Sequence, residues 1–202
     1  MSTNVFTDEM AAPSYTTSWD LTRPAATWLN VVAPRPVTWL STSSIRKRRE
    51  VSGPSTSNPL EVEVIAALLR RADTLAGAAR KKPTVAVLSG YAAQRDALET
   101  RIARSRQQWK NLRIECATID AFQGREADIV VYSLTRSNRR RQLGFVKDPP
   151  RLNVAFSRAQ DALIVVGDDE FARAARGSAQ LCKVLDHISD HPDDCALIGA
   201  EI

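Results

Sequence analysis

The strongest constraint on the fold is a set of short, apolar runs separated by longer helix-like segments. The runs are "VTWLS" (37–41), "TVAVLS" (84–89), "LRIECAT" (112–118), "DIVVYSL" (128–134) and "ALIVVGD" (162–168). Runs that are apolar throughout are typical of strands buried on both faces. The connections between them are too long for hairpins, which favours parallel pairing. The sequence therefore predicts an α/β fold, a parallel sheet with helices on both faces.

The segments between the runs carry helix signals. Asn58 can cap a helix, Pro59 suits its first position, and Glu61 stands where a capping-box acid belongs. An apolar stripe continues this helix towards Arg80. Further helices are predicted over about 92–109 and over 149–160, and residues 169–190 are expected to be mainly helical.

The N-terminal region differs from the rest of the chain. Residues 1–36 contain four prolines and many serines and threonines, which predicts an irregular arm. Trp19 and Trp28 suggest that this arm packs on something. Residues 37–202 are predicted to form one α/β domain, a size that a single core can support.

The charge balance favours a polyanionic partner without requiring one. Lysine and arginine number 28 against 23 aspartates and glutamates, and the sequence pI is about 9.4. Two basic runs stand out, Arg46–Arg49 and Arg139–Arg141. Each could bind nucleic acid or could simply be solvated.

Cysteine and histidine usage argues against structural cross-links. Cys116, Cys182 and Cys195 are too few and too scattered for a disulfide framework, and two histidines make a metal site improbable. The N-terminus has no signal-peptide pattern, and no apolar run approaches the ~20 residues of a membrane span. We expect a soluble, cytoplasmic protein with no metal site and no membrane partner.

Parallel sheets place ligands at the carboxyl ends of their strands. Three segments follow predicted strands and are rich in polar residues: 90–98, 119–128 and 135–159. We expect all three to converge on that one edge.

The third segment contains "RLNVAFSRAQ" (151–160), with two arginines among apolar residues. If Asp148 caps a helix here, Arg151, Ala155 and Arg158 fall on one face, so the two guanidinium groups point the same way. A structural salt bridge is one interpretation for each arginine. The other is phosphate recognition, for which the planar guanidinium supplies paired donors and a permanent charge.

The turn "FQGRE" (122–126) supports phosphate recognition. Gly124 allows a ligand to approach the backbone closely, and Glu126 can accept hydrogen bonds from a ribose hydroxyl or position water. A Gly-Arg-Glu turn is weak evidence alone, but it gains weight from the two-arginine helix some 25 residues later.

Residues 118–168 closely resemble motifs V and VI of superfamily 1 helicases, in the branch that contains the nonsense-mediated-decay and Okazaki-processing helicases. "VAVLSGYAAQRDAL" (85–98) is similar to motif IV, although Gly90 stands where the family usually has proline. The resemblance covers roughly residues 37–170. It implies a RecA-like fold, the second of the two motor domains between which ATP binds and across which single-stranded nucleic acid lies.

The resemblance also implies roles for residues at the nucleotide. Arg158 would reach the γ-phosphate as an arginine finger, and Arg151 would support the site. Gly124 would approach the phosphates, Glu126 would contact the ribose, and Gln123 would orient the turn.

A second set is implied for the nucleic acid. Thr118 and Asp120 begin motif V, and Tyr91 and Gln94 occupy motif IV positions near the strand. The expected nucleic-acid-binding residues are completed by Thr135 and Arg136.

The sequence contains neither a phosphate-binding loop of the type Gly-x-x-x-x-Gly-Lys-Ser/Thr nor a Walker B acidic pair. We therefore expect ATP and Mg²⁺ to be shared with an N-terminal RecA-like domain, in cis or in trans. The chain alone is predicted to be inactive, as a fragment of a longer helicase or a truncated paralogue. The alternatives are a stand-alone nucleic-acid-binding module and a regulatory partner that donates Arg158 to another helicase.

Overall fold

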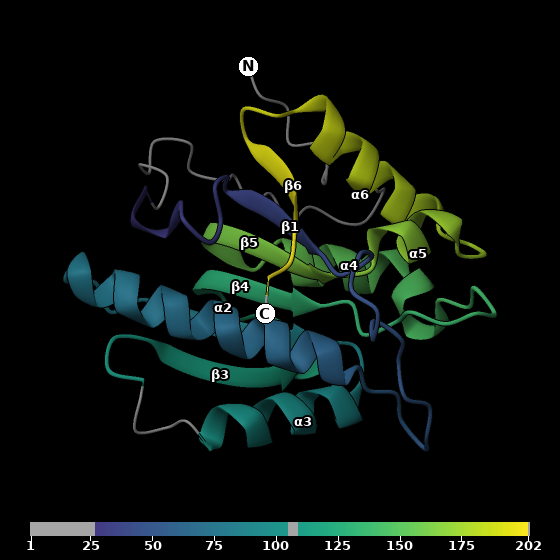
Figure 1. Ribbon diagram of the computed structural model, residues 1–202, viewed down its shortest axis with the longest axis horizontal. Helices are drawn as coiled ribbons and strands as arrows, with labels where there is room; N and C mark the ends of the chain where they lie inside the picture. The colour runs from purple at the N-terminus through teal and green to yellow at the C-terminus, as the bar shows by residue number, and fades with distance from the viewer. Residues whose placement is uncertain (1–26, 105–108, 202) are drawn as a thin grey trace.

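The computed structural model describes residues 27–104 and 109–201. They form a six-stranded sheet in the order β3-β2-β4-β5-β1-β6, with every neighbouring pair parallel (Figure 1). The strands are β1 (Val37–Ser41), β2 (Thr84–Ser89), β3 (Arg113–Thr118), β4 (Ala127–Ser133), β5 (Ala159–Gly167) and β6 (Cys195–Gly199). The predicted parallel α/β fold is confirmed.

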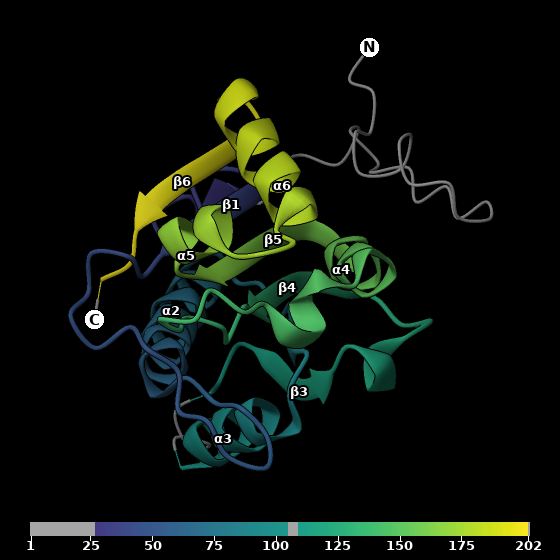
Figure 2. The same cartoon turned by 90° about the vertical axis from the view of Figure 1, so that its right-hand side faces the viewer.

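Helices cover both faces of this sheet (Figure 2). One face packs against α2 (Pro59–Ala78) and α3 (Ala92–Ala103), and the other against α4 (Pro149–Phe156), α5 (Asp169–Ala174) and α6 (Ala179–Asp190). Successive β4 residues bury their side chains in opposite cores, which explains why the run is apolar throughout. The described residues also include the short 3₁₀ segments η1 (Thr27–Leu29), η3 (Asp120–Phe122) and η4 (Gly144–Lys147).

Several predicted helix boundaries were wrong. The helix predicted over 92–109 ends at Ala103. Residues 169–190, predicted to be mainly helical, contain two helices, between which Gly177 adopts a left-handed φ of 76°. Strand β6, "CALIG", was not predicted, although its residues are apolar; it lies at the edge of the sheet, where alternate residues are exposed.

The junction between α4 and β5 also differs from the prediction. The helix ends at Phe156, and strand pairing begins at Ala159, opposite Ala127. Sheet hydrogen bonding thus takes over where the predicted helix would have continued. Arg158 consequently lies outside the helix, so the predicted shared face with Arg151 is not formed.

The predicted boundary of the N-terminal arm falls inside the packed fold. Leu29, Val32 and Ala33 are buried in the same core as α2, so residues 27–36 form part of the domain. Residues 1–26, including Trp19, lie outside the described residues, and their prediction as an arm stays a prediction. No helix in the described part of the chain is long and apolar enough to cross a membrane.

Candidate functional site

The carboxyl ends of β2 and β4 meet above a buried carboxyl group, that of Glu61. Its Oε2 accepts hydrogen bonds from Ser133 Oγ (2.6 Å) and from the Thr135 backbone N–H (2.8 Å), and its Oε1 accepts one from Asn58 Nδ2 (3.1 Å). Complete burial raises the pKa of Glu61 to about 8, against the opposing effect of the bonds from Ser133 and Thr135. Asn58 caps α2 as predicted, by accepting from Glu61 N–H (3.3 Å). Glu61 is not the predicted capping-box partner, because its carboxyl group bonds the end of β4 instead.

Two predicted nucleic-acid-binding residues lie inside this cluster. Gln94 has no exposed surface, accepts from the Asn58 backbone N–H (2.7 Å) and donates to Ser133 Oγ (2.9 Å). Thr135 is equally buried and adopts a φ of 67°, a conformation that is strained for a β-branched residue. The structure therefore gives both side chains a positioning role and leaves neither reachable by a ligand.

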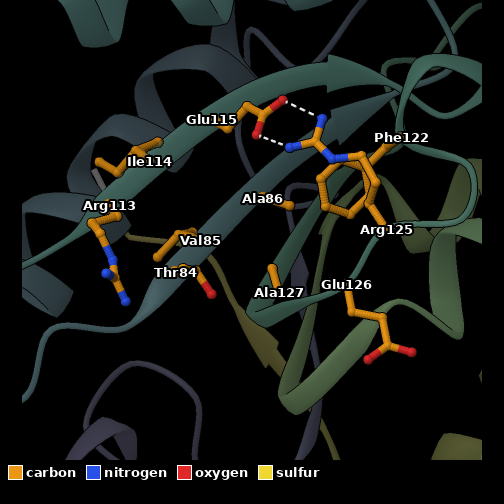
Figure 3. A pocket seen from close by; sticks show the side chains of 10 residues that line it. All are labelled: Thr84, Val85, Ala86, Arg113, Ile114, Glu115, Phe122, Arg125, Glu126 and Ala127. Carbon is orange, nitrogen blue, oxygen red and sulfur yellow. Dashed lines mark hydrogen bonds and ion pairs between the residues drawn. The ribbon is translucent and has the colours of Figure 1, made fainter.

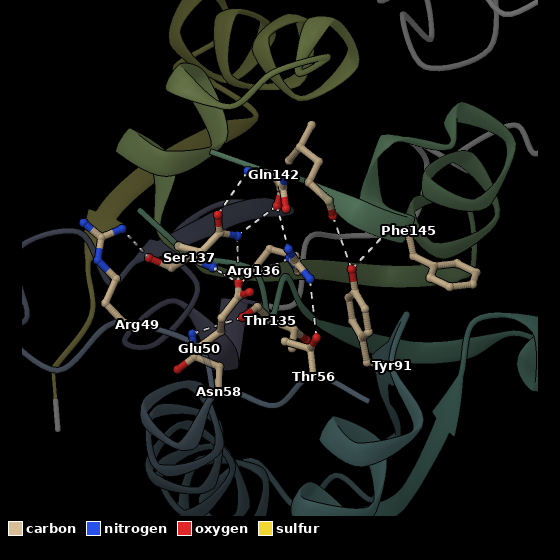
Figure 4. Close-up of polar contacts among 12 residues, drawn as sticks. Arg49, Glu50, Thr56, Asn58, Tyr91, Thr135, Arg136, Ser137, Gln142 and Phe145 are labelled. Atoms are coloured by element: carbon tan, nitrogen blue, oxygen red, sulfur yellow. Dashed lines mark hydrogen bonds and ion pairs between the residues drawn. The ribbon is translucent and has the colours of Figure 1, made fainter. Parts of the chain in front are cut away.

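Arg136, also predicted to bind nucleic acid, is held by the protein itself (Figure 4). Its Nε lies 3.2 Å from the Glu50 carboxylate, and its Nη2 donates to the Gln142 carbonyl oxygen (2.8 Å). Only 12% of the Arg136 side chain is exposed, and Glu50 also accepts from the Ser137 backbone N–H (2.8 Å). Arg136 thus ties the loop after β4 to the loop after β1.

Tyr91, at the start of α3, is buried beneath the 143–145 segment. Its hydroxyl donates to the Leu143 carbonyl oxygen (3.2 Å) and accepts from the Phe145 backbone N–H (3.1 Å). Burial raises the pKa of Tyr91. The side chain anchors this loop and is not free to contact a ligand.

Thr118 and Asp120 remain accessible at the carboxyl end of β3. Thr118 is half-buried and accepts from the Ala121 backbone N–H (3.3 Å), and Asp120 is exposed. Arg151 Nε lies 3.2 Å from the Asp120 carboxylate and 3.7 Å from that of Asp148. Arg151 thus forms the kind of ion pair that one of its two sequence interpretations describes. Asp148 is the N-cap residue of α4 but makes no capping bond with its side chain.

The Gly-Arg-Glu turn and Arg158 lie at the opposite, amino edge of the sheet. The turn leads into β4 and Arg158 leads into β5, and the Ala127 N–H donates to the Arg158 carbonyl oxygen (3.1 Å). Gly124 has a φ of 78° with open space where a Cβ would lie, and Gln123 beside it is exposed. Glu126 is exposed and accepts from Gln160 Nε2 (2.8 Å).

The predicted convergence of all three segments on the carboxyl edge was therefore wrong. Residues 119–126 run back across one face of the sheet, because β4 is parallel to β3 and must start at the amino edge. Helix α4 makes the same return before β5. The sequence prediction did hold in part, because the Gly124 turn and Arg158 are brought together.

The Arg158 guanidinium differs from that of Arg151 in its partners. Nε donates to the Val154 carbonyl oxygen (3.1 Å), and Nη2 donates to Ser157 Oγ (2.9 Å). No carboxylate within residues 27–104 and 109–201 forms an ion pair with it. Its orientation is thus set by neutral groups, and its charge is not neutralised within the described part of the chain.

A pocket of about 290 Å³ opens beside the turn (Figure 3). The amino-terminal halves of β2 and β3 form its floor, with Phe122 and Glu126 at its margin. Arg125 is paired with both oxygens of Glu115 and lies 4.8 Å from the centre of the Phe122 ring. The sequence did not predict this pairing, since Glu115 stands at an ordinary polar position of a strand.

The donor set at this edge fits part of a nucleotide. An unpaired guanidinium matches a phosphate, an open glycine turn admits close approach, and the exposed Glu126 carboxylate can accept from ribose hydroxyls. The pocket volume is near the lower limit for small-molecule sites, which suits a site completed by a second domain.

Comparisons with known proteins identify the family of the chain. The family described as "AAA domain" matches residues 4–170. "Regulator of nonsense transcripts 1 homolog" of Drosophila melanogaster is 56% identical over 55 residues, which are 27% of this chain and 5% of that protein. "DNA polymerase alpha-associated DNA helicase A" of Saccharomyces cerevisiae is 42% identical over 87 residues, 43% of this chain and 12% of that protein.

A third relative, "ATP-dependent helicase NAM7" of Saccharomyces cerevisiae, is 44% identical over 57 residues, 28% of this chain and 6% of that protein. The chain thus spans only a small part of the length of these relatives. The family match covers most of the chain itself, and the parallel sheet has the RecA-like arrangement. The chain therefore belongs to the AAA domain family, as a superfamily 1 helicase domain of the branch that contains the nonsense-mediated-decay helicases.

Proposed function

We propose that this chain is the C-terminal motor domain of an ATP-dependent superfamily 1 helicase and that Arg158 is its arginine finger. The observation that carries the proposal is the Arg158 guanidinium, which has no carboxylate partner in the described part of the chain and belongs to a residue whose backbone carbonyl accepts from the Ala127 N–H, at the end of the Gly124 turn. A guanidinium held by neutral acceptors keeps its full charge for an incoming phosphate.

Each residue around Arg158 would have a different role in binding a nucleotide. The Val154 carbonyl and Ser157 hydroxyl orient the guanidinium, and the open turn at Gly124 admits a phosphate group. Glu126 would accept hydrogen bonds from the ribose, and Gln123 would orient the turn. ATP with Mg²⁺ supplies the phosphoanhydride bond whose hydrolysis drives such motors.

The remaining half of the site has to come from an N-terminal RecA-like domain, in cis or in trans, because the sequence has no phosphate-binding loop. The isolated chain is accordingly expected to hydrolyse no ATP. Arg151 belongs to the other edge of the sheet, where it pairs with Asp120, and it supports the nucleotide site only through α4.

The nucleic-acid track is proposed to run along the carboxyl edge. Thr118 and Asp120 are accessible there and would contact the backbone of a single strand. Tyr91, Gln94, Thr135 and Arg136 would act by positioning the loops around it, because their side chains are committed to protein partners. A cytoplasmic location forms part of the same proposal.

A second candidate function is favoured by one feature, the closeness of the two basic runs. The Glu50 N–H donates to the Ser137 carbonyl oxygen (3.0 Å), which brings the 46–49 loop beside the exposed run Arg139–Arg141. A stand-alone nucleic-acid-binding or regulatory module would need only this surface.

The arginine-finger proposal is tested by Arg158→Ala in the complete motor. Turnover of ATP should fall by roughly 10³-fold, because the charge that stabilises phosphoryl transfer is removed. Arg158→Lys should recover little of the rate, since a point charge does not reproduce the planar fork. Steady-state ATPase assays with single-stranded nucleic acid measure both effects.

Arg173→Ala provides a matched control. Arg173 is a surface arginine in an ion pair with Asp186 (2.6 Å), on α5, and its removal should leave turnover unchanged. If Arg158→Ala hydrolysed ATP at the wild-type rate, the arginine-finger role would be wrong. If the variant lost activity only because the domain unfolded, Arg158 would be a structural residue.

A further inference from the structure

Phe145 is an aromatic side chain that the fold leaves in solvent. Its side chain is 53% exposed, and it is the one aromatic residue among the exposed large apolar side chains of residues 27–104 and 109–201. It stands in η4, in a loop that also presents Lys147 and the run Arg139–Arg141 to solvent. An exposed aromatic ring among cations is typical of proteins that stack nucleic-acid bases.

The backbone holds Phe145 firmly in this exposed position. The Tyr91 hydroxyl accepts from its N–H (3.1 Å) and donates to the Leu143 carbonyl oxygen (3.2 Å). Gly144 between them has a φ of 59°, and a Cβ at that position would lie 2.6 Å from the Tyr91 hydroxyl oxygen. Only glycine therefore lets the loop close on Tyr91, and the ring is presented without the freedom of an ordinary loop.

Two neighbours support the ring itself. The Tyr91 ring packs edge-to-face, with centroids 6.0 Å apart, and the Arg151 guanidinium carbon lies 4.6 Å from the ring centroid. Arg151 is in turn fixed by its ion pair with Asp120 (3.2 Å). The ring is thus connected through Arg151 to the turn that follows β3.

The position of the ring is equally specific. A Cβ at Gly90 would lie 4.0 Å from the Phe145 Cβ, so Phe145 stands beside the carboxyl end of β2. Asp120, on the other side of Arg151, follows the carboxyl end of β3. Phe145 therefore bridges the two segments that the sequence assigned to nucleic-acid contact, although the side chains assigned in the first of them are buried.

We infer that Phe145 is a base-stacking platform for single-stranded nucleic acid, with Arg151 supporting the ring. The inference rests on the proposed helicase function and names the side chain that meets the bases. Stacking on an aromatic face is independent of sequence, because every base has a π surface. The nearby cations then attract the phosphates, while the ring orders the bases.

The test uses the 202-residue chain and a single-stranded oligonucleotide carrying one 2-aminopurine. Stacking of this base on Phe145 should quench its fluorescence. Phe145→Ala should abolish the quenching and weaken binding by about 10-fold, whereas Phe145→Trp should retain both. The slope of log affinity against log salt should stay the same in all three proteins, because an aromatic ring releases no counterions.

Two further variants sharpen the test. Val51→Ala removes another exposed apolar side chain, 55% exposed, and should change neither quenching nor affinity. Gly144→Ala keeps the Phe145 residue but displaces the loop that positions its ring. It should therefore reduce quenching as Phe145→Ala does. Circular dichroism and urea titration confirm that each variant is folded.

Unchanged affinity in Phe145→Ala would overturn the stacking role and assign the ring to contact with another protein. If Phe145→Ala lowered the slope of log affinity against log salt, the stacking role would also be overturned, because the weaker binding would then come from lost phosphate contacts. If the wild-type chain bound no single strand at all, the nucleic-acid part of the proposed function would fail together with this inference. Loss of binding confined to the Phe145 and Gly144 variants supports both.

Discussion

Two groups of carboxylates, one at each edge of the sheet, differ in how far the fold encloses them. At the carboxyl edge, Glu61, Glu50 and Asp168 are nearly inaccessible, and each accepts hydrogen bonds from several donors. At the amino edge, Glu126 and Glu115 are exposed, with few partners. Most of the polar side chains that were predicted to bind nucleic acid at the carboxyl edge are thus enclosed by the fold, Thr118 and Asp120 excepted, while Glu126, on the segment that returns to the amino edge, stays exposed.

Helix α4 connects the two edges. Arg151 lies in its first turn, near Asp120 and Phe145, and Arg158 follows its last residue, near the Gly124 turn. Two arginines seven positions apart therefore serve different edges. A displacement of this helix would move residues at both edges of the sheet.

The largest effect on stability is expected from removing the buried carboxyl group of Glu61, compared with removing the exposed one of Glu126. Glu61→Ala should lower the free energy of unfolding by about 3 kcal/mol, because it opens a cavity and removes the buried acceptor of the Thr135 N–H and of the Ser133 hydroxyl. Glu126→Ala should change it by no more than about 0.5 kcal/mol. Urea denaturation at neutral pH measures both, and equal effects would erase the distinction between the edges.

The pH dependence of stability offers a second test of the buried edge. The pKa of Glu61 is about 8 in the folded protein and 4.5 ordinarily, so between these values the unfolded chain releases a proton that the folded chain keeps. The contribution of Glu61 to stability is complete below pH 4.5 and is lost as pH rises towards 8, at about 1.4 kcal/mol per pH unit where steepest. Urea titrations at pH 5, 6.5 and 8 should show this fall in the wild type. Glu61→Gln cannot ionise and should lack it; a fall of the same size in that variant would assign the effect to other groups.

The smallest expected effect concerns charge at the surface of the carboxyl edge. Replacing Arg139, Arg140 and Arg141 by glutamine should weaken single-strand binding and flatten its salt dependence by up to about 2 log units per log unit of salt, at about 0.7 for each phosphate contact. The matched control neutralises Arg80, Lys81 and Lys82, which are exposed before β2 at the amino edge. Thr118→Ala should lower affinity with little change in slope, since a hydroxyl displaces no counterion. If the arginine variant behaves like the control, the run is only a solvated face.

Local patterns predicted the parts of the fold that depend on local physics. Continuous apolar runs identified five of the six strands, and the Asn58 cap of α2 was found from its residue types. The closeness of the Gly124 turn to Arg158 also followed from the motif pair.

The rest depends on pairings that no local pattern contains. Gln94 and Thr135 are buried because partners from α2 and β4 reach them, and these partners are remote in sequence. The edge at which Arg158 lies follows from the register of β5 on β4. The helical spacing of apolar residues predicted that α4 continues beyond Phe156. In the structure the helix ends there, because Ala159 already pairs with β4.

The placement of β1 between β5 and β6 has a consequence for how the chain folds. Val37 pairs with Leu163 on one side and with Cys195 on the other, so β1 has no partner strand until the last third of the chain is available. Closing loops of that length costs entropy before any contact is made, which makes such topologies slow to fold. During synthesis, the apolar "VTWLS" segment, including the fully buried Trp39, would wait unpaired while some 120 further residues are added, at about 5–20 residues per second. Chaperones that shield exposed apolar segments would therefore be expected to act on β1 first.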